Sequence, residues 1–153
     1  MQSPFQFEVA ACLLFDKNGK LLIYLRDDKP GISFPNHWDL FGGIIEEGET
    51  PEQALVREVK EEIGIDLKEF KFFKTFDCVE GDIQPNRKYI YYVQINHLPE
   101  DLKLLDVGQR IVSIDLNEIG NYPFANILFD IVEDFANSGI DVPKSAEGDV
   151  PVT

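Results

Sequence analysis

The chain has 153 residues, of which 44% are hydrophobic and 12% aromatic, and its formal net charge at pH 7 is -14. Such a length and composition predict a single soluble globular domain and exclude a disordered chain. No apolar run approaches the roughly 20 residues of a membrane-spanning helix, and so negative a field argues against a basic face that would bind nucleic acid.

The first part of the chain predicts strands and turns. Alternating and continuous apolar runs indicate three strands, over residues 7–15, 21–26 and 38–41. Asn18-Gly19 is a hairpin signal between the first two strands. Residues 27–37 contain two prolines and a glycine and therefore predict a loop. The third strand should run directly into the glycine pair Gly42-Gly43.

The clearest helix is expected over residues 51–63. Thr50 is a good N-cap, Pro51 suits the first helical position, and Gln53 completes a capping box with the threonine. An apolar stripe at helical spacing consists of Leu55, Val59 and Ile63. Gly64 supplies the stop signal, because glycine readily adopts the left-handed conformation that ends a helix.

The second half of the chain predicts further strands and a closing helix. Strands are expected over residues 70–79, 88–95 and 110–115. Residues 124–139 read as an amphipathic helix ending at Gly139. Strands and helices do not alternate regularly, which indicates an α/β fold with a mixed sheet between helices. We expect one domain over residues 1–140 and a polar tail over 141–153.

Two cysteines, Cys12 and Cys78, are too few for a disulfide framework and lack metal-ligand spacing. We expect both to be small core residues of a reduced, cytoplasmic protein.

Three glutamates of the predicted 51–63 helix are spaced to share one face. Glu58, Glu61 and Glu62 are three and four residues apart, and each like-charge pair costs an isolated helix about 0.2–0.5 kcal/mol. A charged run is usually a solvated surface. However, these carboxylates do not alternate with lysines, and hard oxygen donors on one face suit Mg²⁺ or Mn²⁺. A bound cation would also let so acidic a chain accept a phosphate substrate.

The segment GIIEEGETPEQALVREVKEEIGI, Gly43 to Ile65, resembles the Nudix box. That pattern fixes a glycine, a glutamate six residues later, an Arg-Glu pair, an aliphatic residue, a Glu-Glu pair, and a final glycine followed by an aliphatic residue. The chain matches all nine positions: Gly43, Glu49, Arg57, Glu58, Val59, Glu61, Glu62, Gly64 and Ile65. So many constrained positions are far more specific than a lone glycine motif.

The resemblance implies a fold and a chemistry. Nudix proteins are alpha/beta/alpha sandwiches that mostly hydrolyse a nucleoside diphosphate linked to another group. By this resemblance the metal ligands would be the three glutamates named above and the main-chain carbonyl of Gly42. Glu49 and Arg57 would fix the loop and helix, although a plain ion pair explains them equally well. Glu58 is the first choice for the carboxylate that takes the proton of the attacking water.

One position departs from the family pattern. Where the family often has Glu-Gly-Gln, this chain has Val107-Gly108-Gln109. A further base or ligand would then have to come from Asp106, Glu80 or Asp82, each of which is more often a solvated loop carboxylate.

The residues that would contact substrate follow from weaker signals. The segment 122–129 is similar to one that holds the purine in Nudix enzymes that remove oxidised guanine nucleotides, which would make Asn126 a reader of the base. The alternative for Asn126 is the N-cap of the last helix. Arg26 could meet a phosphate, and Phe34 and Trp38 could stack on a base, with a surface arginine and ordinary packing as alternatives.

Together these features predict a Mg²⁺- or Mn²⁺-dependent pyrophosphohydrolase acting on a nucleoside triphosphate, with an oxidised purine nucleotide as one option. The rivals are a nucleoside diphosphate sugar or dinucleotide pyrophosphatase, and a nucleotide-binding Nudix module without turnover. The expected partner is a small nucleotide, with neither membrane nor nucleic acid, and family habit suggests a homodimer.

Overall fold

The computed structural model describes residues 5, 7–78, 85–105 and 107–142. The alternative carboxylates Glu80, Asp82 and Asp106 lie outside the described residues, as does the predicted tail from residue 143 onward.

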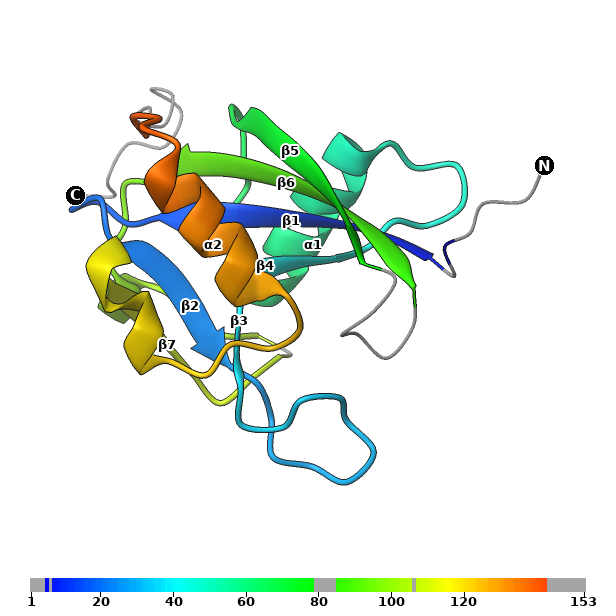
Figure 1. Ribbon diagram of the computed structural model, residues 1–153, viewed down its shortest axis with the longest axis horizontal. Helices are drawn as coiled ribbons and strands as arrows, with labels where there is room; N and C mark the ends of the chain where they lie inside the picture. Colours follow the sequence, from blue (N-terminus) through cyan, green and yellow to red (C-terminus); the bar gives the residue numbers. More distant parts are fainter. Residues whose placement is uncertain (1–4, 6, 79–84, 106, 143–153) are drawn as a thin grey trace.

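A mixed sheet forms the centre of the described structure (Figure 1). Its strands are β1 (Phe7–Phe15), β2 (Leu21–Leu25), β3 (Trp38–Asp39), β4 (Phe41–Ile44), β5 (Lys71–Cys78), β6 (Asn86–Gln94) and β7 (Arg110–Ile114). The main path runs β3-β2-β1-β6-β5, while β4 pairs with β1 and β7 pairs with β2. β1 is parallel to β6 and antiparallel to β2 and β4, which makes the sheet mixed as predicted.

The segment predicted as one strand over residues 38–41 forms two short strands, β3 and β4. β3 pairs with β2, whereas β4 pairs with β1 and extends to Ile44, beyond the predicted end. At Gly42 the backbone φ is 144°, and a Cβ there would collide with the backbone of Ala10. Glycine is therefore required where β4 passes close to β1.

The two α-helices of the described residues cover opposite faces of the sheet. In Figure 1, α2 (Leu128–Asn137) lies in front of the sheet and α1 (Pro51–Ile63) lies behind it. Alternate residues of β1 divide between two hydrophobic cores. Ala11, Leu13 and Phe15 pack in the core on the α2 face. Ala10, Cys12 and Leu14 pack in the core on the α1 face. The fold is thus an alpha/beta/alpha sandwich, because each helix buries an apolar stripe on its own face.

The helix α1 has the bounds and caps that the sequence predicts. The Thr50 side chain accepts a hydrogen bond from the Gln53 backbone, and the Gln53 side chain accepts one from the Thr50 backbone. Gly64 ends the helix with φ 73°. Such a capping box satisfies two backbone donors that a helix N-terminus otherwise leaves unpaired.

The helix α2 begins four residues later than its pattern predicts. Trp38 and Phe124 form a parallel β-bridge, and the Ala125 backbone donates to Trp38. Asn126 has φ 53°, a left-handed conformation that asparagine tolerates. These contacts hold residues 124–127 as an irregular segment.

Two short 3-10 helices, η1 (Pro99–Asp101) and η2 (Leu116–Asn121), complete the described elements.

Cys12 and Cys78 are buried and unbridged, as expected. Among the described residues, no helix has both the length and the apolar composition needed to cross a membrane.

Candidate active site

The strand β4 separates the glutamate face of α1 from a pocket on the α2 side of the sheet. The Gly42 backbone N–H donates to the Glu62 carboxylate at 2.9 Å. At Gly43, a Cβ would overlap the carboxylate of Glu58. The two glycines therefore allow the glutamates to lie directly against the backbone of β4.

The Arg57 side chain organises the loop and helix around the glutamates. Its Nε and Nη2 donate to the two oxygens of Glu49 at 2.7 and 2.9 Å, and Nη2 also donates to the carbonyl of Ile44 at 3.1 Å. Its Nη1 donates to Glu58 at 2.8 Å and to Glu61 at 3.4 Å. The fork on Glu49 is the strong bidentate form of an ion pair. These hydrogen bonds lower the pKa of Glu49 to about 2.

The three glutamates occupy very different environments. Glu62 is 7% exposed, and this burial raises the pKa of its carboxyl to about 9, against the opposing effect of the Gly42 hydrogen bond. Burial also raises the pKa of Glu58, although Arg57 opposes the change. The side chain of Glu61 is 59% exposed. The repulsion expected on this helix face is therefore partly relieved by Arg57 and partly by proton uptake.

The chemistry of the donors fits a divalent metal. Carboxylate oxygens on one helix face, one of them buried against a strand backbone, are the ligands that Mg²⁺ and Mn²⁺ prefer. A buried carboxylate with a raised pKa is also what a cation would stabilise in its charged form. In the part of the chain that the structure describes, no three acidic, histidine or cysteine side chains already stand close enough to form a metal cage.

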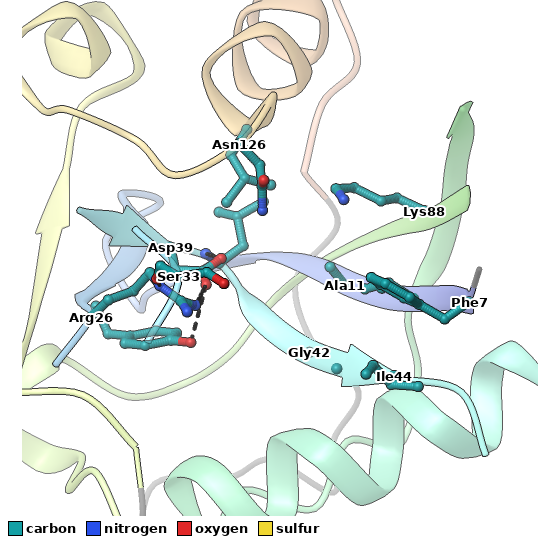
Figure 2. A pocket seen from close by; sticks show the side chains of 14 residues that line it. Phe7, Ala11, Arg26, Ser33, Asp39, Gly42, Ile44, Lys88 and Asn126 are labelled. Carbon is teal, nitrogen blue, oxygen red and sulfur yellow. Dashed lines mark hydrogen bonds and ion pairs between the residues drawn. The ribbon is translucent and has the colours of Figure 1, made fainter. Parts of the chain in front are cut away.

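A pocket of about 460 Å³ opens on the other side of β4 (Figure 2). Its walls come from β1, β2, β3, β4, β6, the loop after β2, and the segment at the start of α2. The lining residues are Phe7, Val9, Ala11, Tyr24, Arg26, Ser33, Asp39, Leu40, Gly42, Gly43, Ile44, Lys88, Asn126 and Leu128. Its volume is that of a small-molecule site, and apolar walls with a few polar groups are typical of such sites.

One polar group of the pocket is an ion pair between Arg26 and Asp39. Arg26 donates to Asp39 at 2.7 Å and to the carbonyl of Ser33 at 2.8 Å, and the Tyr24 hydroxyl donates to the same Asp39 oxygen at 3.3 Å. Burial raises the pKa of Asp39, and Arg26 opposes that change. The arginine is thus held at the pocket wall rather than free on the surface, which was the alternative for this residue.

The second basic side chain in the pocket is Lys88 on β6. It is 5% exposed and donates to the side-chain oxygen of Asn86. Because Lys88 pairs with Val9 in the parallel register of β1 and β6, it lies on the same face of the sheet as the pocket. Figure 2 shows its side chain extending from β6 toward Asn126.

Of the other predicted substrate residues, one lines the pocket and two pack against the core. Asn126 lines the pocket, and the N-cap position of α2 belongs to Ile127, so Asn126 is not the cap of that helix. Phe34 is absent from the pocket lining and packs partly buried against the core on the α2 face, with His37 against its ring. Trp38 is buried edge-to-face against Tyr122, which agrees with the packing alternative.

The segment that departs from the family pattern lies near Arg26. Val107 packs partly buried against the core on the α1 face and brings no carboxylate. The Gln109 side chain donates to the carbonyl of Arg26 and to Asn36, both at 2.7 Å. This segment therefore supports the loop that carries Arg26.

Sequence reasoning missed Asp39 and Lys88. Lys88 shares its strand face with Ile90 and Tyr92, both buried, so strict alternation along residues 88–92 would have placed the lysine inside. Nothing in the local sequence marks Asp39, because its partners Arg26 and Tyr24 belong to another strand.

Comparisons with known proteins agree with this architecture. The NUDIX domain family model matches residues 5–135. A dihydroneopterin triphosphate diphosphatase of Haemophilus influenzae is 31% identical over 65% of this chain and 60% of its own length. An 8-oxo-dGTP diphosphatase of Proteus vulgaris is 37% identical over 49% of this chain and 65% of its own length. This chain therefore spans less than two thirds of either relative.

A solved structure with the same fold is the MutT protein from Methanosarcina mazei Go1. It has a TM-score of 0.76 and 18% identity, and the match covers 92% of this chain and 99% of that one. The alpha/beta/alpha fold expected from the sequence is confirmed.

Proposed function

The chain belongs to the Nudix family, and from this premise we propose that it is a pyrophosphohydrolase that cleaves a nucleoside triphosphate into nucleoside monophosphate and pyrophosphate. The observation that carries the proposal is the position of β4. Its glycines bring the glutamates of α1 against one side of the strand, and a nucleotide-sized pocket opens on the other. A substrate in this pocket would present its diphosphate to the carboxylates at Gly42 and Gly43, which line the pocket, carry no side chain and lie against the glutamates.

Enzymes of this family generally use divalent metals, and the residues that would hold them here are Glu58, Glu61, Glu62 and the carbonyl of Gly42. When bound, Mg²⁺ or Mn²⁺ would neutralise the phosphate oxygens and ease the departure of the leaving phosphate. The residue set agrees with that role, because its donors are hard oxygens and two of the carboxylates are partly or wholly removed from water.

The protein's own residues supply the proton transfer and the positioning. Glu58 is the proposed base, because partial burial raises its pKa and makes it a stronger base than an ordinary carboxylate. Arg57 orients Glu58 through its Nη1 while Glu49 fixes the guanidinium. Arg26, held by Asp39, offers a positive charge at the pocket wall for a phosphate.

The base would occupy the part of the pocket bounded by Asn126. An amide can pair with a base edge as donor and acceptor together. The names of the two relatives, one acting on 8-oxo-dGTP and one on dihydroneopterin triphosphate, support a bicyclic base on a triphosphate chain. An oxidised purine nucleotide is one such substrate.

Turnover of a nucleotide panel with Mg²⁺, with the products identified, tests this proposal. We expect pyrophosphate and a nucleoside monophosphate, whereas two monophosphates would indicate a dinucleotide or diphosphate-sugar substrate. Glu58→Gln should lower kcat by about 10²- to 10⁴-fold, because it removes the base. Glu69→Gln makes the same chemical change at an exposed residue outside the motif and should leave kcat unchanged. Equal hydrolysis by wild type and Glu58→Gln would refute the role of Glu58.

Turnover itself separates an enzyme from a nucleotide-binding module. A protein that binds nucleotides in calorimetry but hydrolyses none with Mg²⁺ or Mn²⁺ would be a sensor. The homodimer stays a prediction, which sedimentation in solution would test.

A further inference from the structure

Lys88 is a buried cation in the pocket that the proposed chemistry does not use. It lies on β6, two strands away from β4, because β1 separates the two strands and Val9 pairs with both Ile44 and Lys88. Two strand spacings amount to about 10 Å. This separation between the β4 and β6 backbones favours contact of Lys88 with a part of the substrate that is remote from the diphosphate.

The side chain opposite Lys88 is Asn126. The two residues come from β6 and from the segment before α2, and both line the pocket. In Figure 2 the Lys88 side chain extends toward Asn126, whose amide enters the pocket from above. An ammonium group only donates hydrogen bonds, whereas an amide both donates and accepts. A base bound between them would meet the donor Lys88 on one side and, on the other, the amide of Asn126, which can donate or accept.

We propose that Lys88, with Asn126, selects bases that carry a lactam edge, which is a carbonyl oxygen next to a ring N–H. This inference rests on the proposed nucleotide hydrolysis. The base carbonyl accepts from Lys88, and the ring N–H donates to the side-chain oxygen of Asn126. Guanine, hypoxanthine, uracil and the oxidised edge of 8-oxoguanine all present this pair of groups.

An amino-bearing base presents the opposite pattern. Adenine and cytosine place an exocyclic amino group where the lactam has its oxygen, so a donor would face the ammonium donor of Lys88. Burial makes this mismatch costly, since neither group can turn to water. A site built around a buried donor rejects a ligand that lacks the acceptor.

Two matched nucleotide pairs test the selection. Deoxyinosine and deoxyadenosine triphosphates differ only at this edge, where a carbonyl next to a ring N–H replaces an amino group next to a bare ring nitrogen. Deoxyuridine and deoxycytidine triphosphates differ in the same way. We expect wild-type kcat/KM to favour the lactam member of each hydrolysed pair by about tenfold to a hundredfold, as for one hydrogen bond to a charged group. The difference should lie mainly in KM, because the base is remote from the reacting phosphate.

Two variants identify Lys88 as the source of the ratio. Lys88→Met should bring the kcat/KM ratio toward one, because it lowers kcat/KM for the lactam nucleotide. Lys88→Gln should also bring the ratio toward one, because its amide oxygen can accept from the amino nucleotide and so raises kcat/KM for that substrate. Lys68→Met, at an exposed lysine outside the pocket, should keep the wild-type ratio. Thermal melts establish that each variant is folded.

The outcomes separate this inference from its premise. An unchanged ratio in Lys88→Met, or an equal loss for both members of a pair, would overturn the selection and indicate a phosphate-binding or structural lysine. Failure to hydrolyse any nucleotide would instead overturn the proposed pyrophosphohydrolase activity. The same ratios would then be measured as dissociation constants by calorimetry, so the selectivity of Lys88 is tested in either case.

Discussion

At the residue scale, Glu62 is a strongly perturbed acid of the glutamate face. Burial raises its pKa from 4.5 to about 9, so the folded, metal-free protein holds this proton at neutral pH while the unfolded chain has released it. Between these two pKa values the folded state binds more protons than the unfolded state. The free energy of unfolding therefore falls as the pH rises through that window. The raised pKa of Glu58 acts in the same direction.

We predict that the metal-free protein melts at a lower temperature at about pH 8.5 than at about pH 5.5, and that Glu62→Gln has a flatter profile. The glutamine keeps an oxygen that can accept from the Gly42 backbone but cannot ionise. Calorimetric melts in a chelator measure the effect. Glu69→Gln, at an exposed residue, should keep the wild-type dependence of melting temperature on pH. Identical pH dependences for wild type and Glu62→Gln would contradict the raised pKa of Glu62.

At the scale of elements, the proposed role of Glu58 requires a close approach of β4 to α1. The Glu58 carboxylate occupies the space that a side chain at Gly43 would need. We predict that Gly43→Ala displaces Glu58 and lowers kcat by about a hundredfold, as expected for a displacement of about 1 Å of a catalytic group. Steady-state kinetics measure the loss.

The control for this prediction is Gly120→Ala in η2. A Cβ there meets nothing within 4 Å, and the glycine does not have a left-handed φ. This variant should keep wild-type kcat. If Gly43→Ala is folded and as active as Gly120→Ala, then Glu58 does not need its position against β4.

At the scale of the whole molecule, the net charge of -14 makes bound cations a source of stability. A ligand that binds only the folded state at about 100 times its dissociation constant adds about 2.7 kcal/mol. For a domain of this size we predict that saturating Mg²⁺ or Mn²⁺ raises the melting temperature by about 5 to 10 °C. Differential scanning calorimetry measures the shift.

General screening of the acidic surface must be separated from specific binding. Potassium chloride at matched ionic strength supplies the screening alone and should produce a smaller shift. Glu62→Gln should lose most of the difference between the magnesium and potassium salts. A wild-type protein that responds equally to both salts would speak against a metal site on the glutamate face.

The sequence by itself determined the helix α1 and the residues that its glutamate face presents. Thr50, Pro51, Gln53 and Gly64 act on backbone groups within a few residues, so the helix bounds follow from local interactions. The same helical spacing placed Glu58 and Glu61 on one face. The two-sided core followed from the apolar runs, because a helix or strand must bury its apolar face.

Only the tertiary structure decided where β4 lies, where α2 begins and which polar side chains enter the pocket. Asp39 and Lys88 acquire their roles from strands that are distant in the sequence, and the late start of α2 follows from the bridge between Trp38 and Phe124. The burial of Glu62, and with it the raised pKa, arises where the helix packs on β4. Local patterns fix hydrogen bonds between near neighbours, whereas desolvation and pairing between distant segments exist only once the chain is folded.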